Sequence, residues 1–290
     1  MKKALFGLFA VMMLAACAMA QEEVTIPENN KFMPSLSLAI DYSTRYMSKG
    51  KIINPEDMFF TDVYVECLGF YFDLWGAFDA NDYNEGKEKG DGVGGVKHTF
   101  EEIDYGFGYA YTFENLDVIN SLGIDVGVTY WDYPKRLGWQ CVNEQQYEWH
   151  LDLSTGLLLN PGMTFYGDFE TEKFYGKLYA NYEYALADNL TLDNKVELFW
   201  GNSKYNANDY SKKHNDVDSS SLDNYKSAFS TFVWTITLTH TINDHFSWGP
   251  YAKLAWALDH DVRETWHAPN SPNSKSGVNN LFGISVSASF

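Results

Sequence analysis

His150 and Asp152 are the residues of this chain whose types and spacing come nearest to acid–base chemistry. A histidine can act as a general base when a carboxylate orients its ring, and residues two apart on a strand point to the same side. The sequence contains no Gly-x-Ser-x-Gly elbow and no His-Glu-x-x-His zinc helix to complete a catalytic set. A polar histidine on a wet strand face explains the pair more simply, so we predict no catalytic residues and no enzyme.

Two other segments resemble ligand-binding motifs. Residues 90–95 formally fit the dinucleotide glycine pattern, but no strand-to-helix context follows them, and a flexible loop is the simpler interpretation. The acidic stretch 209–218 could bind a metal ion, although such stretches are usually just solvated. The sequence therefore predicts no cofactor and no metal site.

The last residues of the sequence indicate the type of secondary structure that positions the polar side chains of this chain. In residues 279–290 every second side chain from Phe282 to Phe290 is apolar, and those between them are glycine or serine. A soluble domain rarely ends on such a strand, because its free edge invites pairing with other chains, whereas a closed barrel has no edge. The pattern predicts a transmembrane β-barrel.

Similar alternation recurs along the chain. It predicts an all-β fold, an antiparallel up-and-down barrel of about 12 strands, which is the even number expected of a bacterial single-chain barrel. The expected strands are residues 35–42, 63–67, 72–78, 102–111, 122–130, 147–153, 162–168, 174–184, 190–200, 234–242, 246–256 and 279–290.

The lengths of the connections support this assignment independently. Links after odd-numbered strands are mostly long and polar, and the link at 169–172 is the exception. Links after even-numbered strands are short. Outer-membrane barrels have this asymmetry, with brief periplasmic turns and longer outer loops. The long links are expected at residues 44–58, 81–97, 134–145, 202–224 and 259–277.

The amino terminus predicts export. Lys2 and Lys3 precede a short apolar run and the small residues 18–20, which together are typical of a secretory signal peptide. We expect a signal peptide at 1–20, a periplasmic leader at 21–33 and the barrel at 34–290. Residues 14–17 also resemble a lipobox, which leaves lipidation of Cys17 open, although a barrel with its own lipid-facing belt needs no lipid anchor.

Composition agrees with this class and excludes others. Aromatic residues make up 17% of the chain, as expected of a barrel with aromatic girdles, and the net charge of −18 argues against a nucleic-acid partner. Cys67 and Cys141 are expected at opposite rims, about 25 Å apart, so no disulfide is predicted between them.

The alternation also predicts which charged side chains face the lumen. Twelve strands tilted by about 40° would enclose a cylinder roughly 24 Å across, leaving a narrow passage once inward side chains are added. The wall would be mainly acidic, which attracts cations and raises the barrier for anions. The acidic lining residues are expected to be Asp41, Glu66, Asp73, Glu102, Asp104, Asp125, Glu148, Asp152, Glu183, Asp193 and Glu197. The opposing bases are expected to be Lys177, Lys195 and Lys253.

Three motifs resemble those of TorF-type porins of Gram-negative outer membranes. They are residues 41–50 (Asp-Tyr-Ser-Thr-Arg-Tyr-Met-Ser-Lys-Gly), residues 123–134 and Asn160-Pro161. That family usually has arginine where Lys49 stands, and this chain has longer acidic insertions. The resemblance implies an outer-membrane barrel of unspecified substrate and supplies no binding residues.

The function predicted from these observations is passive passage of small hydrophilic solutes through the outer membrane, with a preference for cations. The expected partners are outer-membrane lipid, small solutes and the barrel-assembly machinery, which would engage the strand ending in Phe290. Two alternatives stay open: a non-conducting structural or adhesion barrel that uses its outer loops, and a lipid-acting barrel enzyme. The solute, the oligomeric state and any plug in the lumen are not fixed by the sequence.

Overall fold

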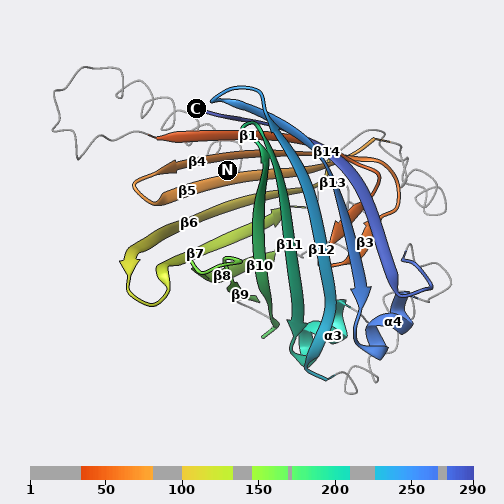
Figure 1. Cartoon of the computed structure of the whole chain (residues 1–290). Helices are drawn as coiled ribbons and strands as arrows, with labels where there is room; N and C mark the ends of the chain where they lie inside the picture. Colours follow the sequence, from red (N-terminus) through yellow and green to blue (C-terminus); the bar gives the residue numbers. More distant parts are fainter. Residues whose placement is uncertain (1–33, 81–99, 133–145, 169–171, 210–225, 267–272) are drawn as a thin grey trace, which may run out of the picture.

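The computed structural model describes residues 34–80, 100–132, 146–168, 172–209, 226–266 and 273–290. Within these ranges, 12 strands close into one antiparallel barrel in which each strand pairs with its neighbours in the sequence (Figure 1). The barrel closes where the first strand pairs with the last. The predicted fold class, a transmembrane up-and-down barrel, is confirmed.

The barrel strands have the following bounds: β1 Ser35–Ser43, β4 Met58–Cys67, β5 Phe70–Asp79, β6 Phe100–Leu116, β7 Asn120–Asp132, β8 Gln146–Thr155, β9 Gly162–Asp168, β10 Phe174–Ala187, β11 Leu190–Gly201, β12 Ala228–Thr241, β13 Phe246–Ala257 and β14 Val278–Ser289. Four smaller elements lie in the connections: strands β2 Tyr46–Ser48 and β3 Lys51–Asn54, and helices α3 Ser203–Asp209 and α4 His260–Trp266. Neither described helix has the length and apolar character needed to cross a bilayer.

The register places the apolar residues of neighbouring strands on the same, outer face. On β6 and β7, Phe107 pairs with Val128 and Tyr109 with Val126, while Gly108 pairs with Gly127 on the inner face. Phe107 is 56% exposed in the isolated chain. Because such side chains would be unfavourable in water but not in hydrocarbon, this outer face is the surface that meets lipid.

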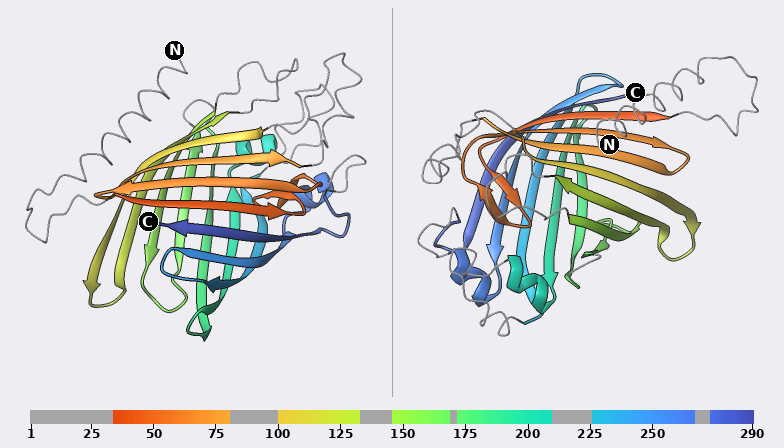
Figure 2. Two further views of the ribbon diagram at one scale, coloured as in Figure 1. Left: turned by 90° about the horizontal axis from the view of Figure 1, so that it is seen from above. Right: turned by 180° about the vertical axis from the view of Figure 1, so that it is seen from behind.

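The connections follow the predicted alternation of lengths. The turn between β4 and β5 is Leu68-Gly69 and that between β10 and β11 is Asp188-Asn189. The prediction placed a turn at 113–120, whereas β6 continues to Leu116 because Phe113 and Glu114 still pair with β7. Figure 2 shows these short turns at the end that carries the C-terminus, with the longer connections at the opposite end. We call these the turn end and the loop end.

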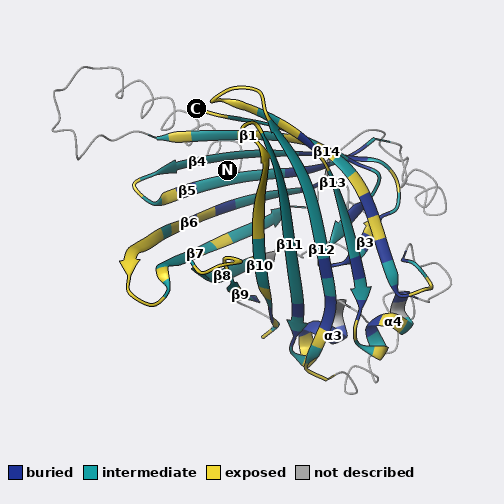
Figure 3. Cartoon of the chain, in the orientation of Figure 1, coloured by how far each residue is buried: buried dark blue, intermediate teal, exposed yellow. Residues whose placement is uncertain are grey.

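The connection from β1 to β4 is more ordered than predicted. Instead of an open outer loop, residues 46–54 form a hairpin of β2 and β3, which we call the lumenal hairpin. Its contacts reach inward-facing residues of β6, β12 and β14, so it lies inside the barrel. Figure 3 shows buried residues gathered towards the loop end, where the hairpin, α3 and α4 lie.

The predictions for 1–33, including the signal peptide, the leader and Cys17, lie outside the described residues, as do Cys141 and the segment 90–95. Cys67 ends β4 and is without a disulfide in the described part of the chain.

Candidate functional site: the charged lumen

The register shows where the charged residues of the strands lie. Every residue predicted to line the lumen has the inward parity of its strand, opposite to the exposed apolar residues. For example, Asp125 pairs with Asp152, whereas the adjacent Ile124 pairs with Leu153 on the outer face. The acids on β4 to β9 lie on one part of the wall, and the three lysines lie on β10, β11 and β13.

His150 belongs to a small polar cluster on the inner wall. Its Nε2 lies 3.0 Å from the Tyr71 hydroxyl and 3.3 Å from Asp125 Oδ1, and the Tyr71 hydroxyl donates to Asp125 at 2.9 Å. The carboxylate beside His150 is therefore Asp125 and not Asp152, which corrects the pairing considered from the sequence. The cluster contains no serine or cysteine nucleophile among the described residues, and its contacts satisfy a lumenal histidine.

Glycines on the neighbouring strands make room for this cluster. A Cβ at Gly108 would lie 2.3 Å from the Tyr71 hydroxyl oxygen, and one at Gly127 would lie 2.5 Å from His150 Cε1. Larger residues at these inward positions would collide with the rings that lie across them. The inward glycines of β6 and β7 are thus sites where an aromatic side chain from the next strand covers the backbone.

Asp152 and Glu148 are held by hydroxyl donors from β9 and β10. Thr164 donates to Asp152 Oδ1 at 2.5 Å and Tyr179 donates to Asp152 Oδ2 at 2.8 Å. Tyr175 donates to Glu148 Oε2 at 2.7 Å. Hydrogen bonds of this kind to charged acceptors stabilise carboxylates in a partly buried wall.

Lysines surround one acid on the opposite part of the wall. Glu197 lies between Lys177 Nζ at 2.9 Å and Lys195 Nζ at 3.3 Å, and Lys253 also interacts with it electrostatically. Lys195 keeps 39% of its side-chain surface exposed, whereas Glu197 keeps 14%. One carboxylate is therefore shared among three ammonium groups in this sector of the wall.

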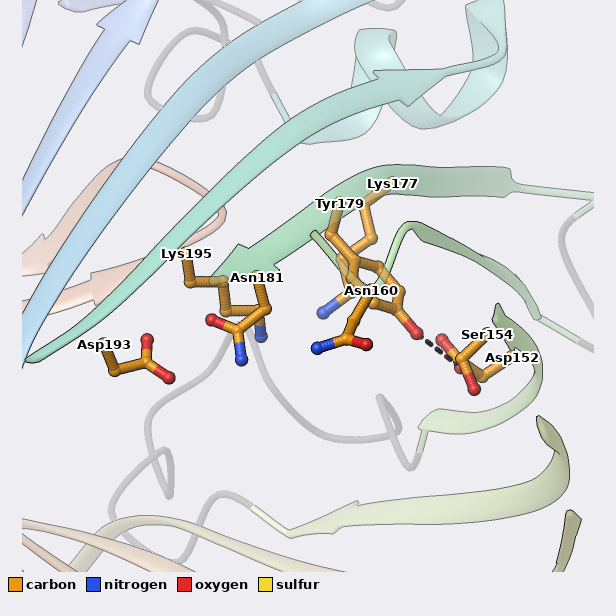
Figure 4. A pocket seen from close by; sticks show the side chains of 8 residues that line it. All are labelled: Asp152, Ser154, Asn160, Lys177, Tyr179, Asn181, Asp193 and Lys195. Carbon is orange, nitrogen blue, oxygen red and sulfur yellow. Dashed lines mark hydrogen bonds between the residues drawn. The ribbon is translucent and has the colours of Figure 1, made fainter. Parts of the chain in front are cut away.

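A pocket of about 360 Å³ lies between these two sectors (Figure 4). Lys177, Tyr179, Asn181, Asp193 and Lys195 come from β10 and β11, and Asp152 and Ser154 of β8 face them. Asn160, in the β8–β9 connection at the turn end, completes the lining. The pocket offers ammonium, amide, hydroxyl and carboxylate groups around space large enough for several water molecules or a small polar solute.

The lumenal hairpin crosses the loop end of the lumen. At one side Tyr46 donates to Glu102 of β6 at 2.7 Å. At the other side Thr231 of β12 donates to the carbonyl oxygen of Lys49, and the Asn279 amide of β14 donates to that of Gly50, both at 2.8 Å. The hairpin thus connects opposite walls of the barrel. It makes the passage narrower than the width predicted from the number of strands alone.

Sequence reasoning missed several charged residues of this lumen, among them Asp62, Asp168 and Lys49. Asp62 and Asp168 have inward parity, since Asp62 pairs with Trp75 and Asp168 with Glu148. Extending the alternation of residues 63–67 by one step would have found Asp62, and following it to the end of residues 162–168 would have found Asp168. Lys49 could not be found in this way, because it belongs to the hairpin and reaches the lumen through tertiary contacts.

Beyond the membrane-spanning strands, charges pair at the loop end. Lys204 of α3 forms an ion pair with Glu172 in the β9–β10 connection and lowers the pKa of that exposed carboxyl. Both side chains are largely exposed, so this pair contributes little to stability.

These features define the chain as a transmembrane β-barrel with a charged lumen. No family model and no curated protein matches it. Among solved structures it is similar to a KdgM porin, with 12% identity, a TM-score of 0.45 and coverage of 88% of this chain and 99% of that one. It is also similar to the COG4313 outer membrane channel from Pseudomonas putida F1, with 11% identity, a TM-score of 0.43 and coverage of 93% and 98%. A NanC porin matches at 11% identity and a TM-score of 0.41 over 88% and 98%. Likenesses at this level say nothing of this chain's function.

Proposed function

We propose that this protein is an outer-membrane channel for the passive passage of small hydrophilic solutes, and that its lumen prefers cations. One observation carries the proposal: a closed barrel with an apolar outer face has charged, partly exposed side chains along its inner face. Lys195 and Asp125 keep 39% and 36% of their side-chain surface exposed inside this wall. Charges that were only filling a solid core would be buried more fully.

The preference for cations rests on the balance of charge along the wall. The acids on β4 to β9 outnumber the lysines on β10, β11 and β13, even after Lys49 is added. Several of these acids are close neighbours, since Asp62 and Asp73 interact electrostatically and Asp104 interacts with Glu102. An excess of fixed negative charge raises the local cation concentration and excludes anions.

The location and assembly of the barrel follow from the same proposal. The exposed apolar face needs the hydrocarbon of the outer membrane, and the C-terminal strand would be the segment that the assembly machinery engages. Phe290 exchanges backbone hydrogen bonds with Leu36 at the closing seam. Deleting Phe290 should reduce the yield of folded barrel in isolated outer membranes, and an unchanged yield would contradict this role.

Planar-bilayer recording tests the channel proposal. The folded protein should conduct, and in a tenfold gradient of potassium chloride its reversal potential should have the sign of a cation-selective pore. Asp193→Asn removes one pocket carboxylate and should move that potential towards zero. The matched control is Glu172→Gln, which removes a carboxylate outside the lumen. Anion selectivity would contradict the cation preference, and a correctly folded but silent barrel would contradict the channel.

The filled loop end favours a second candidate, a non-conducting barrel. Trp266, Val262, Tyr205 and Tyr175 form a buried cluster there, and the lumenal hairpin lies beside it. A barrel closed in this way could serve as a structural element or as a carrier of outer loops for adhesion. Silent bilayers together with retained surface binding would favour this candidate.

A further inference from the structure

Lys49 places its ammonium group among aromatic rings at the loop end of the lumen. Its Nζ lies 3.9 Å from the ring centroid of Tyr175, 5.2 Å from that of Trp131 and 5.5 Å from that of Tyr205. These rings come from β10, β7 and α3, so three separate parts of the chain converge on one cation. Recognition of ammonium ions by several aromatic faces is the main functional use of cation–π attraction.

Carboxylates reinforce the attraction of these rings for a cation. Tyr175 donates its hydroxyl hydrogen to Glu148, which increases the electron density of its ring. Glu148 and Asp104 both interact electrostatically with Lys49. The stacked rings of Tyr166 and Tyr205, with centroids 4.6 Å and 4.4 Å from that of Tyr175, fix the Tyr175 ring in place. We call Trp131, Tyr175, Tyr205 and Glu148 the aromatic cage.

The cation in the cage is tethered to the wall by backbone contacts and not by its own side chain. Thr231 and Asn279 bind the carbonyl oxygens of Lys49 and Gly50. The hairpin would therefore keep its position if the Lys49 side chain were shortened. The cage is built by residues of β7, β8, β10 and α3, none of which belongs to the hairpin, and the lysine occupies it as an internal ligand.

We propose that the aromatic cage is a binding site for organic ammonium ions, such as methylated amines, and that Lys49 occupies it competitively in the absence of such a solute. The binding itself does not require conduction, whereas transport of such ions through the lumen rests on the proposed function. A tethered group competes at an effective concentration on the order of millimolar for short linkers. A free ammonium solute with the same intrinsic affinity as the lysine must exceed that concentration to displace Lys49 in the wild-type protein.

Calorimetric titration of the detergent-folded protein with tetramethylammonium chloride tests the site, with sodium chloride as the ionic control. Lys49→Ala empties the cage, and we expect its half-saturating concentration to be at least tenfold lower than that of the wild type. Lys195→Ala is the matched control, because it removes the same charge from the lumen but lies away from the cage. Adding Trp131→Leu to Lys49→Ala should abolish the binding. Heat-modifiable mobility on gels checks that each variant is folded.

The outcomes separate this site from the channel. Equal titrations of Lys49→Ala and Lys195→Ala would overturn the site, and so would binding that survives Trp131→Leu. Planar-bilayer current adds a second readout, since tetramethylammonium should block or permeate Lys49→Ala at lower concentrations than the wild type. If tetramethylammonium binds more tightly to Lys49→Ala but the barrel conducts no current, the site is supported and the channel is refuted. If the barrel conducts but Lys49→Ala does not bind more tightly, the channel is supported and the site is refuted.

Discussion

Replacing Gly50 with valine should release the lumenal hairpin from the barrel wall. Gly50 has φ +84°, and a Cβ there would lie 3.1 Å from Thr231 Cβ and 3.2 Å from Ala255 Cβ. A residue with a side chain loses about 1–2 kcal/mol in the left-handed region. The added methyl groups would press on two buried side chains, and overpacking of this kind costs typically 1–3 kcal/mol.

These terms together weaken the docked hairpin by about 2–5 kcal/mol, which is more than a tenfold change in the docked-to-undocked ratio. The two hydrogen bonds at the tip, from Thr231 and Asn279, contribute about 1 kcal/mol each and cannot offset the upper part of that range. We therefore expect a larger undocked population in Gly50→Val than in the wild type.

Limited trypsin digestion of the folded barrel in detergent measures that population, because Arg45, Lys49 and Lys51 are cleavage sites within or beside the hairpin. Gly50→Val should be cut there much faster than the wild type. Gly277→Val is the matched control: it has φ +76°, and its Cβ would meet Arg263 and not the residues behind the hairpin tip. Equal resistance of Gly50→Val and wild type, with both barrels folded, would refute the reasoning.

Two more predictions concern the lumen wall. Gly127→Val should prevent closure of the barrel, because its Cβ would lie 2.5 Å from His150 Cε1 and 2.6 Å from the Tyr71 hydroxyl oxygen. Heat-modifiable mobility measures this, with the lipid-facing Val128→Ile as the control, and a normally folded Gly127→Val barrel would contradict the assigned packing. Glu197→Gln removes the carboxylate shared by the lysines. One charge contributes about 1 kcal/mol to the energy of an ion about 4 Å away in water, so the cation-to-anion permeability ratio should fall by about fivefold. A reversal potential in a salt gradient measures it, and an unchanged value would exclude Glu197 from the permeation path.

The sequence predicted the barrel because strand periodicity depends on local pattern alone. With a side-chain period of two, residues such as Asp125 and Asp152 must share the inner face once the neighbouring Ile124 and Leu153 face lipid. The closing seam required no further information, since in an up-and-down barrel only the first and the twelfth strand each have one side left to pair.

The pairing of His150 needed the register, which the sequence does not supply. Residues two apart on one strand and diagonal residues on adjacent strands lie at similar distances, so spacing alone could not choose between Asp152 and Asp125. Asp152 is occupied by Thr164 and Tyr179, while Asp125 lies diagonally across from His150. Cross-strand geometry therefore decided which acid the histidine contacts.

The lumenal hairpin escaped prediction because its strands are too short to show a period. β2 has three residues and β3 has four, so their alternation is not distinguishable from chance. One signal was present: Tyr46, Met47 and Ile52 are apolar residues in a connection expected to be polar. Ile52 is 1% exposed and Tyr46 is 8% exposed, so these side chains pack inside the barrel and do not project into solvent.

The hairpin also bears on how the barrel is assembled. Its partners are distant in the sequence: the bond from Thr231 to Lys49 joins residues 182 apart, and the bond from Asn279 to Gly50 joins residues 229 apart. Contacts of such separation form late, because closing long loops costs entropy before any contact is gained. Because β1 and β14 meet only at the closing seam, the hairpin that follows β1 can bond β12 and β14 together only in a closed wall. The segment 41–50, which carries the resemblance to TorF-type porins, contains the first half of this hairpin. Its first residues, 41–43, form part of the closing seam, and its hairpin residues, 46–50, narrow the lumen that the strands enclose.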